Sequence, residues 1–128
     1  MGKTIELTAS DGHKLSAYQA DAAGAKGGMI VIQEIFGVNA HVREVADLYA
    51  KQGYTSIAPA LFDRAERGVE TGYTPADQDR VKPIRAALKW DQVLADVAAS
   101  RDALKKMGIQ KIGIVGYCFG GSVSWLTA

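Results

Sequence analysis

The chain has 128 residues, of which 48% are apolar and 23% charged, and its formal net charge at pH 7 is +1. These values are ordinary for one globular domain, and the near-neutral balance provides no basic surface for binding nucleic acid. No apolar run approaches the ~18 residues of a membrane span, and the single cysteine excludes an internal disulfide, so we expect a cytoplasmic protein.

The N-terminal part of the sequence predicts a hairpin followed by a buried strand. Apolar and polar residues alternate over 5–8 and again over 15–18, on either side of an Asp-Gly turn. We expect His13, in that turn, to be a solvated loop residue. Residues 29–32 form a continuous apolar run, which is typical of a strand buried on both faces. Because ligands of open α/β sheets bind outside the carboxyl ends of strands, the polar loop 33–39 that follows is a candidate for chemistry.

A helix and another strand are predicted after this loop. Asn39 is a good N-cap, the apolar spacing that follows has the helical period, and Gly53 ends the helix. His41 lies in the first turn of this helix. There an exposed position is favoured over a role as general base, because the positive helix end opposes formation of an imidazolium. Residues 54–59 predict the next strand.

From Leu61 to Pro83 the sequence is strongly charged and shows no clear periodicity. So long an irregular stretch inside a domain is usually functional or mobile, and a solvated surface excursion is the alternative. A helix with one apolar stripe then runs to about Met107, with Gly108 as its cap. We expect the stripe to be core; it consists of Trp90, Val93, Leu94, Val97, Leu104 and Met107.

The most specific motif is Gly116-Tyr117-Cys118-Phe119-Gly120-Gly121, which follows a predicted strand over 109–115 and precedes a helix over 120–128. A strand that breaks into a Gly-flanked nucleophilic residue is typical of a nucleophile elbow, here with Cys118 in place of the usual serine. One alternative is a buried, structural cysteine. Another is a dinucleotide-binding turn, which fits poorly because it requires glycine at the position of Cys118. The order of the elements predicts an α/β fold with a mostly parallel sheet and an N-terminal antiparallel hairpin.

With both motifs in place, the sequence resembles the dienelactone hydrolase family of α/β-hydrolases. The resemblance is carried by residues 33–39 and 116–121, covers essentially the whole chain, and is loose between Asp63 and Leu88. It implies an α/β-hydrolase-like sheet truncated after the elbow, so that residues 1–128 form a single partial domain. The strands that carry the family's catalytic Asp and His follow the elbow and are absent from this sequence.

The resemblance also implies a chemistry. Cys118 would be the nucleophile that opens an ester or lactone through an acyl-thioester, and Glu34 would contact the resting cysteine. The backbone N–H groups of Ile35 and Phe119 would form the oxyanion hole. Either Arg80 or Arg85 would bind a carboxylate of the substrate. The implied partner is a small-molecule ester or lactone, with no cofactor, metal, nucleic acid or membrane.

We expect the chain alone to be weakly active or inactive, because no base for the thiol or for water is identified in it. A second hypothesis is a non-catalytic half-domain that acts by self-association or complementation, since the apolar strand 112–115 would lie at an exposed sheet edge. A nucleotide-binding protein is the third hypothesis.

Overall fold

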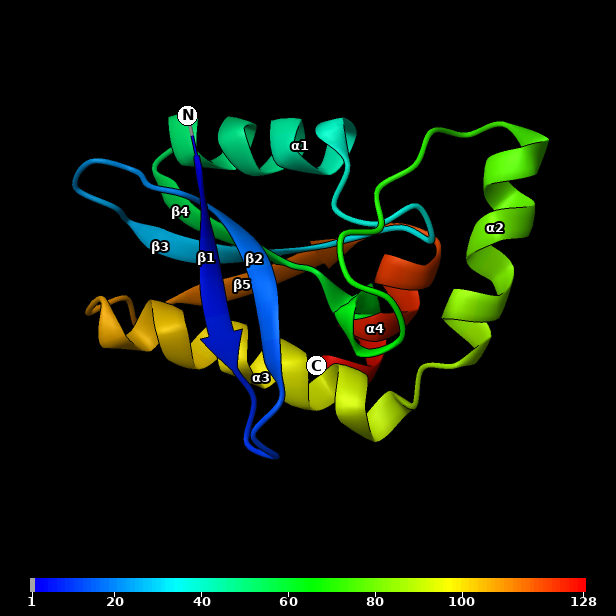
Figure 1. Cartoon of the computed structure of the whole chain (residues 1–128). Helices are drawn as coiled ribbons and strands as arrows, with labels where there is room; N and C mark the ends of the chain where they lie inside the picture. Colours follow the sequence, from blue (N-terminus) through cyan, green and yellow to red (C-terminus); the bar gives the residue numbers. More distant parts are fainter. Residues whose placement is uncertain (1) are drawn as a thin grey trace.

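The computed structural model describes residues 2–128, and its helices cover both faces of one five-stranded sheet (Figure 1). The elements in chain order are β1 (Lys3–Thr8), β2 (Lys14–Ala20), β3 (Gly27–Ile32), α1 (Ala40–Lys51), β4 (Tyr54–Pro59), the 3₁₀ turn η1 (Leu61–Arg64), α2 (Pro75–Ala86), α3 (Trp90–Lys106), β5 (Ile112–Gly116) and α4 (Phe119–Thr127). None of the helices described is both long and apolar enough to cross a membrane.

The sheet has the strand order β1-β2-β4-β3-β5. The predicted hairpin is confirmed and is longer than expected, since Lys3 of β1 already lies opposite Gln19 of β2. Strand β2 is also antiparallel to β4, whereas β3 is parallel to both β4 and β5. The parallel pairs are joined through helices, as parallel strands require, and the carboxyl ends of β3 and β5 therefore lie side by side.

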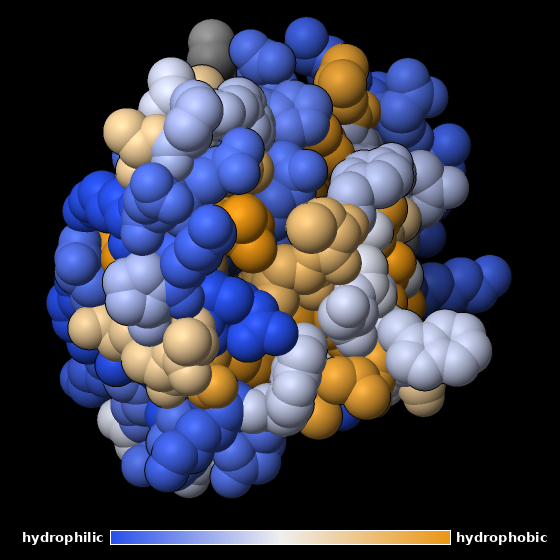
Figure 2. Space-filling model, turned by 90° about the vertical axis from the view of Figure 1, so that its right-hand side faces the viewer, coloured by the Kyte–Doolittle hydropathy of each residue, from blue (hydrophilic) through white to orange (hydrophobic). Residues whose placement is uncertain are grey.

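Two apolar clusters lie on the two faces of this sheet. Helix α1 covers one face, and α3 and α4 cover the other (Figure 1). Residues 30–32 of β3 are buried among both clusters, which explains why this strand reads as one apolar run. Figure 2 views the end of the molecule that carries α2 and the loop after β3, and it shows apolar side chains gathered across the middle of this end.

The segment between β4 and α3 is more regular than expected. It begins with η1, and residues 75–86 form helix α2, so the expectation of an irregular stretch from Leu61 to Pro83 was wrong over most of this helix. Thr74 and Asp77 form a capping box at its start. The helix buries only Val81 and Ile84, which is why its sequence carries almost no periodic signal.

A buried arginine joins the hairpin tip to the helical layer. The Arg64 side chain, 9% exposed, donates through Nε and Nη2 to the fully buried Asp96 at 2.9 and 2.8 Å, and through both Nη atoms to Asp11 at 2.8 and 3.1 Å. These hydrogen bonds from the guanidinium lower the pKa of Asp11 to about 2. Burial instead raises the pKa of Asp96, although Arg64 opposes that shift.

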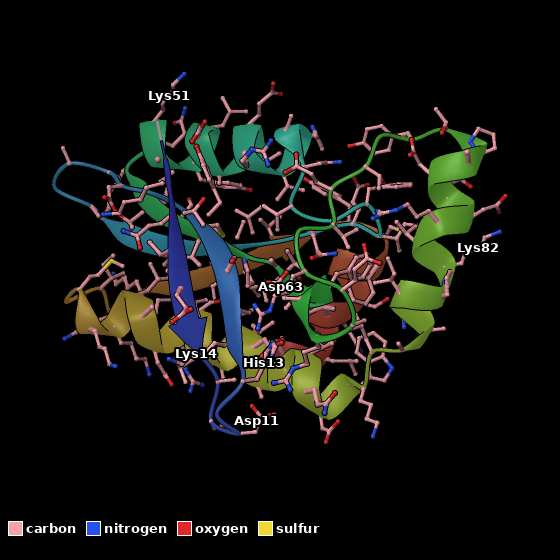
Figure 3. The ribbon with its side chains drawn as sticks, in the orientation of Figure 1. Asp11, His13, Lys14, Lys51, Asp63 and Lys82 are labelled. Atoms are coloured by element: carbon pink, nitrogen blue, oxygen red, sulfur yellow. The ribbon has the colours of Figure 1, made fainter. Side chains whose placement is uncertain are left out.

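His13 lies in the same turn as Asp11 (Figure 3). Its side chain is partly buried, and its Nε2 atom is buried without a hydrogen-bond partner in residues 2–128. The expectation of a solvated loop residue was therefore wrong, because the hairpin tip folds onto the protein.

Replacing Arg64 by alanine should lower the free energy of unfolding by about 3–5 kcal/mol, since the Asp96 carboxylate would be left buried and unpaired. Arg101 is the matched control, because its side chain is 51% exposed and its one ion pair within residues 2–128 is with the exposed Asp102. Arg101→Ala should cost less than about 0.5 kcal/mol. Urea denaturation of the two variants measures both values, and equal losses would contradict a special role for the buried pair.

Candidate active site

Cys118 lies in the turn between β5 and α4, in a backbone conformation that is unfavourable for a residue with a side chain. Its φ is 56° and its ψ −120°, and no other non-glycine residue in 2–128 has a positive φ. The turn is closed by two backbone hydrogen bonds, from Gly120 N–H to the Tyr117 carbonyl at 2.9 Å and from Ser122 N–H to the Cys118 carbonyl at 3.1 Å. The residue is exposed, so the alternative of a buried, structural cysteine was wrong. This is the geometry of the predicted elbow.

The first turn of α4 packs directly against the end of β3. A Cβ atom on Gly120 would lie 2.7 Å from the Gln33 carbonyl oxygen and 2.8 Å from that of Ile32, and one on Gly116 would collide with the backbone of Gly120. Only glycine permits such an approach of backbone to backbone. The contact brings the start of α4 to the loop after β3. Phe119 is the first helical residue, and its N–H therefore has no acceptor within the helix.

The loop after β3 carries Glu34 and Ile35, both of which are partly buried. Glu34 lines a narrow pocket together with Tyr117, the neighbour of Cys118, and with His41. His41 is exposed in the first turn of α1, as expected. The structure thus places a carboxylate and an imidazole beside the elbow.

The far end of the loop is held by residues 68–71. Thr71 N–H donates to the Phe36 carbonyl at 3.0 Å, and the Asn39 side chain, the predicted N-cap of α1, donates to the Thr71 carbonyl at 3.0 Å. Gly37 has a φ of 82° and lies so close to the Val69 carbonyl that no Cβ fits there. The loop is therefore fixed from both sides, by the elbow and by this segment.

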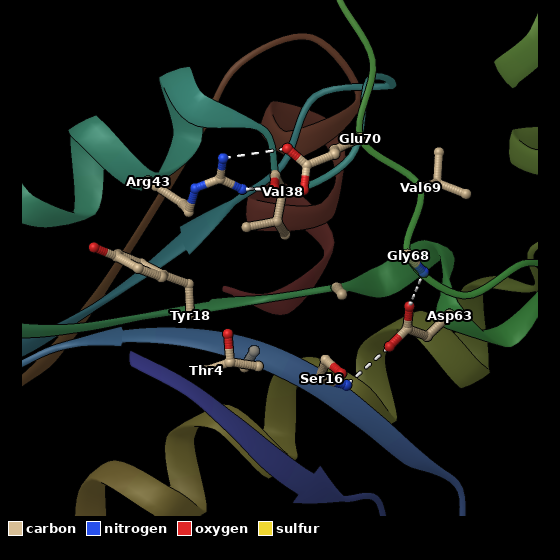
Figure 4. A pocket seen from close by; sticks show the side chains of 11 residues that line it. Thr4, Ser16, Tyr18, Val38, Arg43, Asp63, Gly68, Val69 and Glu70 are labelled. Carbon is tan, nitrogen blue, oxygen red and sulfur yellow. Dashed lines mark hydrogen bonds and ion pairs between the residues drawn. The ribbon is translucent and has the colours of Figure 1, made fainter. Parts of the chain in front are cut away.

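A cavity of about 150 Å³ with both polar and apolar walls lies behind the loop (Figure 4). The Arg43 guanidinium donates to the Val38 carbonyl at 2.8 Å and pairs with Glu70 at 3.2 Å. On the opposite wall, the Asp63 carboxylate accepts from the N–H groups of Ser16 at 2.8 Å and Gly68 at 3.4 Å. These bonds tie the loop and residues 68–70 to α1 and β2.

The two candidate arginines lie in different surroundings. Arg80 is paired with Glu66 through a contact of 2.6 Å on the exposed side of α2. The Arg85 guanidinium carbon lies 4.7 Å from the centre of the Phe119 ring and 5.0 Å from that of Trp90. Arg85, and not Arg80, is thus in contact with the residue that follows Cys118.

Trp90 was expected in the core, but its side chain is 40% exposed at the first residue of α3. Its ring stacks on that of Phe119, with 6.0 Å between the ring centres. The sequence shows that residue 90 is aromatic, but it does not show that α3 begins at this residue and so places the ring beside the elbow.

The backbone strain at Cys118 should be measurable as a difference between two substitutions. Gly tolerates this conformation and Ala does not, so Cys118→Gly should be more stable than Cys118→Ala by about 1 kcal/mol. The same two substitutions at Arg101, which is exposed in the interior of α3, should give the opposite order, because Gly is the weaker helix former by about 1 kcal/mol. Urea denaturation decides this, and an Ala variant that is the more stable at both positions would contradict the strain.

Comparisons with known proteins agree with this architecture. A family model, described as the dienelactone hydrolase family, matches residues 15–128. The carboxymethylenebutenolidase of Pseudomonas putida is 33% identical over 130 residues, which cover 97% of this chain and 54% of that protein. A Synechocystis protein regarded as a carboxymethylenebutenolidase is 37% identical over 120 residues, 90% of this chain and 49% of the relative.

Among solved structures, a protein of Klebsiella pneumoniae regarded as a dienelactone hydrolase superposes with a TM-score of 0.80 at 31% identity. The match covers 100% of this chain and 55% of that one. The chain therefore spans about half the length of the relatives it matches. With the α/β-hydrolase arrangement of its sheet and a family match over residues 15–128, the chain belongs to the dienelactone hydrolase family.

Proposed function

We propose that this chain supplies the nucleophile and the oxyanion-binding groups of a site that hydrolyses carboxylic esters or lactones. The observation that carries the proposal is the backbone of Cys118, with φ 56° and ψ −120° and with its side chain exposed at the start of a helix. A non-glycine residue in such a conformation costs about 1–3 kcal/mol and persists where the surrounding structure enforces it, most often at functional sites.

In the proposed reaction the thiolate sulfur of Cys118 attacks the carbonyl carbon of the substrate. The carbonyl π electrons move to oxygen, and the N–H groups of Ile35 and Phe119 donate hydrogen bonds to that oxyanion. Collapse of the intermediate breaks the bond to the leaving oxygen, which takes up a proton and departs as an alcohol, or stays attached if the substrate is a lactone. Water then cleaves the thioester to give the acid and the free thiol.

Two further side chains have proposed roles. Glu34 would interact with the resting Cys118, a role supported by the pocket that Glu34 shares with Tyr117. Arg85 would bind a carboxylate of the substrate, which is supported by its contact with the Phe119 ring, whereas Arg80 already pairs with Glu66. A guanidinium against an aromatic face keeps its edge available for a carboxylate.

The second half-reaction needs a base that activates water. A free thiol of ordinary pKa ~8.5 is a few per cent thiolate at neutral pH, so acylation can proceed slowly without a base. His41 is the candidate base within this chain, because it lines the same pocket as Glu34. The relatives are about twice as long as this chain, and we expect the chain alone to turn over weakly or not at all.

Mixing the chain with p-nitrophenyl acetate should release a burst of p-nitrophenol of about one equivalent per chain, followed by slow turnover. Mass spectrometry should locate one acetyl group on Cys118. Cys118→Ser is the matched control. A hydroxyl is far less acidic than a thiol, so this variant should show no burst.

The later part of the time course identifies the base. Sustained turnover that disappears in His41→Ala would assign the base to that residue. A burst without turnover would leave Cys118 as a competent nucleophile in a site that lacks a base. Identical traces for the unmodified chain and for Cys118→Ser would contradict the proposed function.

A non-catalytic role by self-association is the second candidate, and the edge of the sheet supports it. Strand β5 is one of the two edge strands of the sheet, and a groove of about 470 Å³ beside it is lined by apolar residues including Ile112, Ile114 and Leu94. Leu126, also in the groove, is 49% exposed, and the neighbouring Trp125 is 82% exposed. An open apolar edge of this kind pairs readily with another strand, and a second copy of the chain would present the same edge.

Under this second proposal the chain should form dimers or larger species in multi-angle light scattering. Leu126→Lys should shift it toward the monomer, because a lysine would be buried at the contact. Leu48→Lys is the control, since Leu48 is 57% exposed on α1 at the other face of the sheet, and it should leave the mass unchanged. A monodisperse monomer for the unmodified chain would count against self-association.

A further inference from the structure

Gln33 is fully buried, and both ends of its side-chain amide are engaged. It is the first residue after β3, and its exposed fraction is 0%. The Oε1 atom accepts a hydrogen bond from Leu61 N–H at 3.0 Å, at the start of η1. The Nε2 atom donates to the Glu34 carbonyl at 3.0 Å. A polar side chain buried this completely is costly unless it is hydrogen-bonded, and these two bonds give both its oxygen and its nitrogen a partner.

The second of these bonds bears on the proposed oxyanion hole. The Glu34 carbonyl and the Ile35 N–H belong to the same peptide unit, which is planar and trans, so that the two groups point in opposite directions. A donor that holds the carbonyl therefore fixes the direction of the N–H. The side-chain amide of Gln33 is in turn held by Leu61 N–H, which follows β4. The orientation of the Glu34–Ile35 peptide is therefore fixed relative to β4 as well as to β3.

The backbone of Gln33 also faces the elbow. Its carbonyl oxygen is one of the two atoms against which Gly120 packs, next to Phe119. Gln33 thus contacts α4, which carries the Phe119 N–H, and also holds the peptide that carries the Ile35 N–H. Oxyanion donors are effective only when they are aimed in advance at the place where charge develops.

We propose that Gln33 is a positioning residue that aims the Ile35 N–H at the oxyanion. The inference rests on the proposed function, because it assumes that an oxyanion forms at Cys118. It assigns to Gln33 no contact with substrate. Its side chain acts through the orientation of the Glu34–Ile35 peptide.

Three variants of the full chain separate this role from a purely structural one. Gln33→Glu keeps an acceptor for Leu61 N–H, but as a carboxylate it cannot donate to the Glu34 carbonyl. Gln33→Met removes both bonds at similar volume. Gln19→Met is the control. Gln19 is also buried, at 6% exposure, but its side chain donates a hydrogen bond to Asp21, which directly follows β2 and lies away from the elbow.

The measurement is the ratio of two rates at Cys118, namely acylation in the p-nitrophenyl acetate burst and alkylation by iodoacetamide. Both need the thiolate, but alkylation passes through no oxyanion, so the ratio cancels changes in thiolate content. Gln33→Met and the ionised Gln33→Glu variant should lower the ratio about 10- to 100-fold. Gln19→Met should leave it unchanged.

The pH profile of Gln33→Glu gives a signature that general destabilisation would not give. Burial should raise the pKa of the introduced carboxyl, and its protonated form can donate to the Glu34 carbonyl. The ratio should therefore recover as the pH falls through that pKa, while the ratio of the unmodified chain stays flat. A ratio unchanged by Gln33→Glu at high pH would overturn the inference.

Amide NMR distinguishes a failure of this inference from a failure of the proposed function. In Gln33→Glu the Ile35 amide should shift and exchange faster, while the Leu61 amide stays protected. Unchanged Ile35 signals would overturn the positioning role even where the burst is observed. Absence of a burst in the unmodified chain, with normal alkylation, would instead overturn the proposed function on which the role rests.

Discussion

The site depends first on the close packing of α4 against the end of β3. Gly120 lies directly on the carbonyl oxygens of Ile32 and Gln33, and Gly116 lies on Gly120, with no side chain between them. The two proposed oxyanion donors, Ile35 and Phe119, come from segments far apart in the sequence. They come near each other because two glycines let the backbones meet. Any larger residue at either position would separate β5 and α4 from the loop that carries Glu34.

The strain at Cys118 is offset by packing around the next residue. Phe119 is buried, and its ring lies 6.1 Å from that of Phe62 and 6.0 Å from that of Trp90. Burial of an aromatic side chain and its ring contacts contributes on the order of 2–4 kcal/mol, which is similar in size to the ~1–3 kcal/mol cost of the backbone conformation. The turn η1 contributes twice, because Phe62 packs on Phe119 while Leu61 N–H holds the side chain of Gln33. Arg64 then fixes this turn to α3.

The segment between β4 and α3 contacts both parts of the candidate site, namely the loop after β3 and the elbow. Residues 68–71 hold the loop after β3, and α2 presents Arg85 to the Phe119 ring. A solvated surface excursion was one interpretation of this charged stretch. The contacts instead favour the functional interpretation, since they brace the loop with Glu34 and bring a guanidinium beside the elbow. Salt bridges such as that of Arg80 with Glu66 lie on its outer, exposed side.

The sequence by itself determined the elements that have strong local signals. The apolar run 29–32, the cap at Asn39 and the glycine frame around Cys118 each predicted their element, because strand burial, helix capping and a tight turn demand specific residue types at specific spacings. Helix α2 was missed because it buries so little that no apolar period marks it, although Thr74-Pro75 and Asp77 carried a capping signal. Only the tertiary structure decided that β2 pairs with β4, that Arg85 lies at Phe119, and that Gln33 holds the Glu34–Ile35 peptide. The first two depend on contacts between segments distant in the chain, and the third depends on the Leu61 N–H, 28 residues away, which holds the Gln33 amide in place. Such long-range contacts leave no periodic or spacing signal in a single sequence.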